Sequence, residues 1–520
     1  MKRAKPILVF LVLLLAAASY LQAQTTYTWN GSDDFFWSTP ENWTPSGPPT
    51  AADDVIIPSG TPDKPYCLAG DACNSITFNA VFPQSATIRN YSNLTITSGT
   101  VTYNRYITCP SHYHYLSSPV SSPNTWGGAG GIFSDEMHTF VRSWDEPSQM
   151  WVNHTNAQAP AVYKGYSFYS DGDAGSCDNL ATFVGTPVLP LPAKTVTIVK
   201  TLNTALSGFN LIGNPFLGAI NCGQIFTQGS QINNFIYIYD GVEGGYDSFS
   251  NDGDPGNDDF TNINPCQGFF VQRSGGAGSG TFTYPTAVYH QTDPFLKNIQ
   301  EPVNYLYVRV NGNETFYSDA KIMIRSGASA ALDPMEDGHF LGGDELAPQL
   351  YSMTSDNYKT MHNVYPPEPN TVVPLGFYTG YDDSFTMTFS YLESFPPETG
   401  FILEDLKTGT THNLRDNPEY TFAYTVNDDP DRFLLHIDGL TGIDNPVAHE
   451  NVKIITTGNQ VNIHSNGLQG EVMVYNMVGQ QIHHTELAGG EISFTVEKPG
   501  IYIVNIISED AESNHKIYIH

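Results

Sequence analysis

The stretch 385–391 reads FTMTFSY, and the stretch 235–241 reads FIYIYDG. In both, a large apolar side chain recurs at every second position. This spacing places one set of side chains on one face of an extended strand and the remaining set on the other face. Gly, Pro, Asn and Asp bound such stretches along the chain, whereas the 3.6-residue repeat of an amphipathic helix is almost absent. The sequence therefore predicts an all-β protein.

The composition agrees with many strands joined by tight turns. Aromatic residues make up 12% of the 520 residues, charged residues only 14%, and there are 46 Gly and 35 Pro. The chain carries 22 Lys and Arg against 53 Asp and Glu, a formal net charge of −31. A polyanion of this size repels nucleic acid and anionic lipid surfaces. We therefore exclude nucleic acid as a partner.

The first residues have the layout of a secretory signal peptide. Lys2, Arg3 and Lys5 precede an apolar run over 7–18, and small residues follow up to Ala23. The run is too short for a stable membrane span, and no later apolar stretch is long enough. We expect residues 1–23 to be removed, and the mature chain to be extracellular or on the outer cell surface after passing through the periplasm.

Six cysteines follow this leader, namely Cys67, Cys73, Cys109, Cys177, Cys222 and Cys266. An even number of cysteines in an exported chain favours disulfides over metal or catalytic thiols, and six allow fifteen pairings. The short loop CLAGDAC makes a bridge between Cys67 and Cys73 the expected local disulfide.

Turn signals and strand-like stretches divide the remainder into four segments. Residues 25–105 open with Trp29, Trp37 and Trp43 as a Trp-rich cap, followed by short strands that can stack as β-helix-like rungs. A β-rich module is expected over 106–295, a β-sandwich domain over 300–440, and a C-terminal immunoglobulin-like sandwich over 443–520.

The last segment carries two recurring strings, GEVMVYNMVGQQI and GIYIVNI, and ends in HKIYIH. These resemble the C-terminal sorting domain of proteins exported by the type IX secretion system, and the upstream segments resemble modules of the same class of proteins. The matching residues are Gly470, Tyr475, Gly479, Gly500, Tyr502, Val504 and Lys516. The resemblance implies two partners, the type IX secretion machinery and a sortase-like peptidase that removes the domain. An ordinary terminal immunoglobulin-like domain is the alternative.

An acidic, glycine-bent loop, NDGDPGNDDF, is the candidate metal site. It supplies Asp252, Asp254, Asn257 and Asp258 as oxygen ligands of the kind that calcium prefers. The loop lacks the terminal bidentate Glu of the twelve-residue calcium loop, and a solvated turn is the alternative reading. Apart from calcium, no cofactor is expected.

No catalytic signature is found. The G-x-S-x-G, H-E-x-x-H and phosphate-loop patterns do not occur, so we expect a protein that is not an enzyme. The 30 Tyr and six Trp suit stacking against sugar faces. The sequence therefore predicts a structural or adhesive protein that binds extracellular glycans or proteins. The alternatives are an extracellular polymer-degrading hydrolase and a passive surface spacer.

Overall fold

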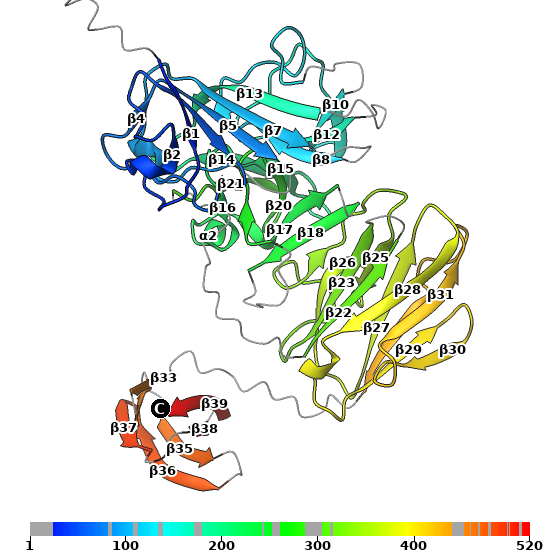
Figure 1. Cartoon of the computed structure of the whole chain (residues 1–520). Coiled ribbons are helices and arrows are strands. Elements are labelled where there is room, and N and C mark those ends of the chain that lie inside the picture. Colours follow the sequence, from blue (N-terminus) through cyan, green and yellow to red (C-terminus); the bar gives the residue numbers. More distant parts are fainter. Residues whose placement is uncertain are drawn as a thin grey trace, which may run out of the picture. The chain divides into compact units, whose positions relative to one another are not determined.

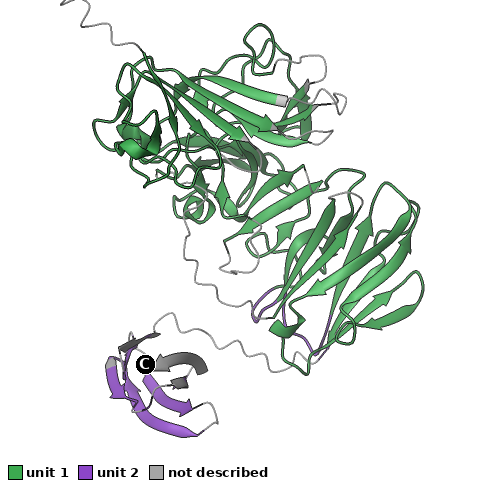
Figure 2. Ribbon diagram, in the orientation of Figure 1, with its two compact units in different colours: residues 1–323, 329–364, 372–437 green, residues 324–328, 365–371, 438–520 purple. Residues whose placement is uncertain are grey.

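The structure is a computed structural model that describes residues 24–81, 86–107, 113–133, 139–170, 179–241, 244–251, 260–286, 304–312, 316–438, 452–457, 459–465, 469–476, 480–496, 498, 500–508 and 512–519. It divides into two compact units (Figure 2). The larger unit comprises residues 1–323, 329–364 and 372–437, and the smaller one 324–328, 365–371 and 438–520. None of the described helices is long and apolar enough to cross a membrane.

The larger unit begins with a stack of short parallel strands, drawn in blue in Figure 1. Its successive parallel strands are β1 (Thr26–Trp29), β3 (Asp54–Pro58), β5 (Ser75–Val81) and β7 (Val101–Ile107). A second parallel pair, β4 (Ala72–Cys73) with β6 (Thr95–Ile96), runs along the same coils. One coil cannot bury its own apolar face, but stacked coils share a continuous core. The predicted β-helix-like rungs are confirmed.

The three tryptophans form the start of this core. Trp29, Trp37 and Trp43 are 1–2% exposed, and the Trp43 ring meets the other two edge-on at 5.0 and 4.7 Å. A short 3-10 turn, η1 (Pro40–Asn42), leads into β2 (Trp43–Thr44), which pairs with β1. The buried Asn42 amide donates to the Asp34 carboxylate at 2.7 Å, which fixes the loop over the rings.

The chain then leaves the coils and returns to them. β13 (Asn179–Pro187) pairs antiparallel with β7, and β9 (Val120–Ser121) adds to its far end. The residues between β7 and β13 also contribute a separate four-stranded sheet. Its order is β11-β10-β12-β8, and its strands are Met150–Asn153 (β11), Thr139–Asp145 (β10), Gly165–Ser170 (β12) and His114–Ser117 (β8).

A second four-stranded sheet has the order β15-β20-β17-β18, made of Phe209–Gly213 (β15), Gly268–Arg273 (β20), Ile232–Asp240 (β17) and Gly245–Ser250 (β18). Two strand pairs complete this region: β14 (Thr195–Lys200) with β21 (Gly278–Thr283), and β16 (Ile220–Asn221) with β19 (Asn262–Ile263). The short helix α2 (Cys222–Phe226) follows β16, and the 3-10 turn η2 (Tyr91–Asn93) lies in the coils. One apolar cluster runs from the tryptophans to Tyr284.

Residues 304–438 form one 11-stranded sheet, ordered β30-β29-β32-β27-β25-β26-β23-β22-β28-β31 with β24 paired to β26. Its strands are Tyr305–Asn311 (β22), Tyr317–Ile324 (β23), Gly338–His339 (β24), Gln349–Met353 (β25), Lys359–Tyr365 (β26), Asn370–Tyr378 (β27), Asp383–Ser390 (β28), Gly400–Asp405 (β29), Thr410–Asn413 (β30), Glu419–Tyr424 (β31) and Phe433–Asp438 (β32), with the 3-10 turn η3 (Leu392–Ser394) before β29.

This sheet folds over its own core and almost closes. Phe377 of β27 packs within 5.2 Å of the Phe385, Phe422 and Tyr424 rings of β28 and β31. A side chain joins the two ends of the sheet, because the Tyr420 hydroxyl of the end strand β31 donates at 2.9 Å to the Asp405 carboxylate of β29, the strand next to the other end strand, β30. The predicted sandwich is thus a single nearly closed sheet, which we call the folded sheet.

The smaller unit contains seven described strands in two sheets. β33 (Val452–Thr457), β34 (Gln460–Ser465) and β37 (Glu491–Thr495) form one sheet. β36 (Gln481–Ala488), β35 (Gln469–Asn476), β38 (Gly500–Ser508) and β39 (Glu512–Ile519) form the other, in that order. Val472 and Val474 of β35 are 0% exposed, as their alternation predicts. The nearly all-β fold is confirmed.

Within the larger unit, His339 of β24 is a buried contact between the folded sheet and the sheet that contains β17. Its side chain is 1% exposed, its ring lies 5.7 Å from Phe209, and its backbone N–H donates to the Tyr237 hydroxyl at 3.0 Å. Burial and the nearby Lys200 ammonium lower the pKa of His339 to about 4. The neutral imidazole is therefore the form that the fold accepts.

Acidification is expected to weaken the fold through this histidine. In the unfolded chain this histidine takes up a proton below about pH 6.5, whereas in the folded chain it does so only near pH 4. Protonation therefore favours the unfolded chain, and the free energy of unfolding decreases as the pH falls through this range. Between about pH 7.5 and 5.2, the wild type should lose about 1.5–2 kcal/mol relative to His339→Phe. Urea midpoints of the two chains, measured above the isoelectric point of about 4.6, check this.

Asp337 near Tyr237 has the opposite pH dependence. Burial raises its pKa to about 7, so its contribution to stability grows as the pH falls. Comparing the wild type with His339→Phe cancels the contribution of Asp337, because both chains keep it. Equal pH dependence in the two chains would contradict the role given to His339.

Candidate functional site

A row of aromatic rings with one guanidinium lies on the sheet β11-β10-β12-β8. Its five members, which we call the aromatic row, are Tyr113, Phe140, Arg142, Trp151 and Tyr169. Arg142 lies 4.5 Å from the centre of the Tyr113 ring and 5.1 Å from that of Trp151. Tyr169 lies 4.9 Å from Tyr113 and 6.3 Å from Phe140. The rings and the cation form one continuous surface.

The strand register explains why these residues meet. Phe140 and Arg142 are two positions apart on β10 and therefore share a face, while Val141 and Ser143 point the other way and are buried. Phe140 pairs with Tyr169 of β12. Trp151 of β11 pairs with Trp144, which continues the same face of β10.

The aromatic row is accessible, although it rests on a buried cluster. Phe140 is 51% exposed, and the other four members are half-buried. Beneath them, Tyr115 is 4% exposed and packs against Trp151 at 5.9 Å and Phe270 at 5.6 Å. The Tyr115 and Tyr246 hydroxyls are hydrogen-bonded to each other. A rigid base of this kind holds the exposed rings in fixed positions, which lowers the entropy lost on binding.

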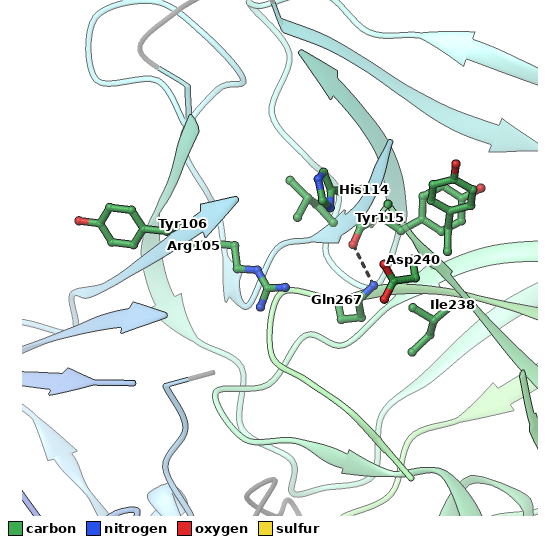
Figure 3. Close-up of a pocket in the computed structure, with 10 residues that line it drawn as sticks. Arg105, Tyr106, His114, Tyr115, Ile238, Asp240 and Gln267 are labelled. Atoms are coloured by element: carbon green, nitrogen blue, oxygen red, sulfur yellow. Dashed lines mark hydrogen bonds between the residues drawn. The ribbon is translucent and has the colours of Figure 1, made fainter. Parts of the chain in front are cut away.

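A small crevice adjoins the base of the row (Figure 3). Its volume is about 70 Å³, and its lining includes Arg105, His114, Tyr115, Asp240 and Gln267. Gln267 Nε2 donates to the Tyr115 carbonyl oxygen at 3.2 Å and to the Gly268 carbonyl oxygen at 3.0 Å. Figure 3 shows Arg105 reaching toward Gln267. The crevice has room for the tip of a polar group rather than for a sugar ring.

Two phenols, the buried Tyr115 and the half-buried Tyr246, lie beneath the aromatic row. Burial, followed by the neighbouring Tyr246, raises the pKa of Tyr115 well above its ordinary value. Burial also raises the pKa of Tyr246 to about 12. Neither of these two hydroxyls ionises near neutral pH, so both act as neutral hydrogen-bonding groups in the base of the row.

The candidate calcium ligands Asp252, Asp254, Asn257 and Asp258 lie outside the described residues, directly after the segment that ends β18. Among the residues that the structure does describe, no group of three or more His, Cys, Asp or Glu side chains could hold a metal ion. The calcium site stays a prediction.

The disulfide predicted between Cys67 and Cys73 is not formed: both are free, buried thiols. The turn between them is closed by hydrogen bonds instead, because Leu68 N donates to the Asp71 carboxylate at 2.7 Å and Asp71 N donates to the Leu68 carbonyl at 3.2 Å. Burial raises the pKa of Cys73 to about 12. Cys222 and Cys266 are likewise free and buried, and Cys109 and Cys177 lie outside the described residues.

Residues 75–437, more than half of the chain, match the model of a family described as a domain of unknown function, DUF8693. The chain is a member of the DUF8693 family. The match includes part of the coils, the aromatic row and the folded sheet up to residue 437, and it ends before the strands β33 to β39.

The DUF8693 chain also shows similarity to two proteins of Porphyromonas gingivalis. It is 24% identical over 417 residues to the minor fimbrium subunit Mfa5 of Porphyromonas gingivalis, which covers 71% of this chain and 33% of Mfa5. The chain thus spans about a third of the length of this curated relative. A solved structure of PorZ, described as an essential surface component of the type IX secretion system of P. gingivalis, is 12% identical, with 75% of this chain and 51% of that chain covered and a TM-score of 0.13.

The structure brings the matching residues of the terminal segment together on two neighbouring strands. Gly470 and Tyr475 lie on β35, and Gly500, Tyr502 and Val504 lie on β38, which pairs with it. A Cβ on Gly470 would stand 2.0 Å from the Ile507 carbonyl oxygen, so only glycine allows this approach. Lys516 lies on β39 opposite Ile503, and Gly479 lies outside the described residues.

The sequence reasoning did not find the aromatic row. Phe140, Arg142 and Trp144 alternate in FVRSW, which is the signal that could have placed them on one face. Tyr113 and Tyr169 come from other strands, and the pairing that brings them to Arg142 is not visible in the sequence.

Proposed function

We propose that this DUF8693 protein is an exported, non-enzymatic surface protein that binds extracellular glycans through the aromatic row. The observation that carries the proposal is the continuous half-exposed surface of four rings around the Arg142 guanidinium. Exposed aromatic rings held together by a buried base are costly in water and are typical of binding surfaces.

Sugar chemistry fits this surface. The C–H faces of a pyranose ring stack on aromatic rings, and a guanidinium donates several hydrogen bonds in a fixed plane to hydroxyl or carboxylate oxygens. The Tyr113 and Tyr169 hydroxyls of the row supply further hydrogen-bonding groups. The adjoining crevice, with Arg105, Asp240 and Gln267, can accept one polar substituent of the bound sugar.

The second part of the proposal concerns delivery. The smaller unit is a compact sandwich of its own and carries the residues that resemble a type IX sorting signal. The similarity to a fimbrium subunit also supports a place at the cell surface. The partners proposed for delivery are the type IX secretion machinery and a sortase-like peptidase, and the route runs through the periplasm to the outer surface or the medium.

A polymer-degrading hydrolase is the second candidate function, and a passive spacer is the third. A hydrolase would need two convergent carboxylates at the sugar. The aromatic row itself contains no carboxylate, and Asp240 is the one acidic side chain in the described lining of the crevice. This favours binding without cleavage over hydrolysis.

Trp151→Ala and Phe140→Ala are each expected to weaken retention on the recognised polysaccharide by about fivefold or more, because loss of one stacked ring removes on the order of 1–3 kcal/mol. Phe140 is 51% exposed, so its removal leaves the core intact. Met335→Ala, a 44% exposed residue outside the aromatic row, is the matched control and should bind as the wild type does. Retention is measured by affinity electrophoresis in gels that contain the polysaccharide. Unchanged retention of both ring variants would refute the assignment.

A further inference from the structure

A second and larger cavity opens beside the strand β14. Its volume is about 260 Å³. It is lined by the Trp144 and Tyr163 rings, by Val162, Leu211 and Ile212, by the charged Asp145 and Lys164, and along one wall by Val196, Thr197 and Val199 of β14. The cavity is therefore a slot with a mixed apolar and polar lining, and residues of β14 form part of its wall.

One edge of β14 is hydrogen-bonded to β21. On the opposite edge, only some of the backbone N–H and C=O groups have hydrogen-bond partners among the described residues. Tyr284 N donates to the Lys194 carbonyl at 2.8 Å, which fixes the alternation of the ladder with β21. By this alternation Val196 and Ile198 bond to β21, whereas Thr195, Thr197 and Val199 direct their N–H and C=O groups to the opposite edge.

Side chains cover the C-terminal end of that edge. The Asn210 amide takes the place of a neighbouring strand, because Val199 N donates to Asn210 Oδ1 at 2.9 Å and Asn210 Nδ2 donates to the Val199 carbonyl at 2.9 Å. The buried Glu146 carboxylate accepts the next outward N–H, that of Thr201, at 2.9 Å. The fold thus satisfies two outward positions with dedicated side chains.

Thr195 and Thr197 form the uncovered part of the edge. Both are exposed, and in the part of the chain that the structure describes their outward backbone groups have no hydrogen-bond partner. An open edge is a template for another strand, and proteins commonly block such edges. Along this edge, side chains cover the backbone at Val199 and Thr201 but not at Thr197, which lines the 260 Å³ cavity.

We propose that this edge binds an extended segment of a partner protein, which adds as a strand beside β14 and inserts one apolar side chain into the cavity. Two outward residues at alternate positions, about 7 Å apart, match the repeat of an extended polypeptide. A sugar has no such repeat.

The surroundings of β14 agree with an apolar segment. Exposed leucines lie in both connections of β14: Leu189 and Leu191 before it and Leu202 and Leu206 after it, all 39–58% exposed. The charged residues that line the slot are Lys164, Asp145 and the buried Glu146, whose carboxylate is already bound to the Thr201 backbone.

The test uses the full chain and its Thr197→Pro variant. Proline removes the outward N–H of Thr197 without breaking a bond to β21, and proline is tolerated on strand edges. Thr197→Val keeps the N–H and is the matched control. Thr195→Pro, at the first residue of β14, is a second blocking variant that the strand accommodates. Circular dichroism confirms that each variant is folded.

The probe is a phage-displayed library of random twelve-residue peptides, panned on the wild type. The expected result is enrichment of peptides with alternating apolar residues, whose fluorescence anisotropy shows the same affinity for Thr197→Val and at least tenfold weaker binding to both proline variants. The proposal is overturned if no peptide is enriched, if the enriched peptides bind all four chains equally, or if soluble polysaccharide competes for the slot. Glycan retention by the aromatic row should be the same in all four chains, so the two proposals fail independently.

Discussion

Replacing Arg432 with leucine is expected to lower the free energy of unfolding of the folded sheet by about 3–5 kcal/mol, because it leaves a buried carboxylate without its cation. Arg432 and Asp405 are 4% and 0% exposed. The guanidinium donates to both Asp405 oxygens, at 2.8 and 2.6 Å, and to the Ala423 carbonyl at 2.7 Å. The pair links β29, β31 and β32 near the place where the two ends of the sheet meet.

The pKa of Asp405 agrees with this assignment. Burial raises it, but the hydrogen bonds from Arg432 and Tyr420 outweigh burial and hold it at about 2. The stability from this depressed pKa is present above the ordinary value near 3.8 and is lost as the pH falls through about 2. At neutral pH the carboxylate is charged, so removal of Arg432 has its full effect.

All six tryptophans lie before residue 152, so their fluorescence does not report on the folded sheet. Hydrogen exchange of β29 and β32 in Arg432→Leu is the suitable measurement. Lys407→Ala is the matched control, because Lys407 is 41% exposed in its pair with Asp428 and such pairs contribute under about 1 kcal/mol. A loss in Arg432→Leu no larger than that in the control would show that the buried pair does not hold the sheet.

A chain that ends at Asp438 is expected to accumulate in the periplasm, with at least a tenfold loss of surface label, in a bacterium that has a type IX system. This truncation removes β33 to β39 and leaves every strand of the larger unit in place. The export proposal locates the signal in the smaller unit. Gly470 and Tyr475 lie on β35, and Tyr502 and Val504 lie on β38, the two central strands of its four-stranded sheet. Surface labelling and cell fractionation report the location.

Two results distinguish a sorting signal from a merely stabilising domain. The retained chain should still be folded, with glycan binding intact. Residues 443–520 joined to an unrelated periplasmic protein should carry that protein to the surface. Normal surface label on the truncated chain would refute the export proposal, whatever its stability.

Local patterns predicted the local structure. The alternation at Val472 and Val474 placed them in a core, where both are 0% exposed. Gly409 turns the hairpin between β29 and β30 with a φ of +65°, a conformation that glycine adopts without strain. Both features depend only on residues a few positions apart, for which side-chain periodicity and turn chemistry are sufficient.

The contacts between residues far apart in the chain could not be predicted from the sequence. β13 returns to pair with β7, and Arg432 reaches Asp405 across 27 residues. Such pairings depend on which strands meet in space, and one sequence does not encode this in its periodicity. The prediction of a disulfide between Cys67 and Cys73 was wrong for a related reason. The number and spacing of cysteines do not indicate that Asp71 closes the turn between them with hydrogen bonds. The glycan expectation came from aromatic content alone and could not name Arg142 or its neighbours.

The most direct test of the central claim is a binding and cleavage measurement on the mature chain. The protein is incubated with a panel of insoluble neutral and acidic polysaccharides, with calcium present, and each sample is assayed for sedimented protein and for new reducing ends. We predict that at least one polysaccharide retains the wild type, that Trp151→Ala is not retained, and that no reducing ends appear. New reducing ends would establish the hydrolase alternative, and no retention on any polysaccharide would contradict glycan binding by the aromatic row.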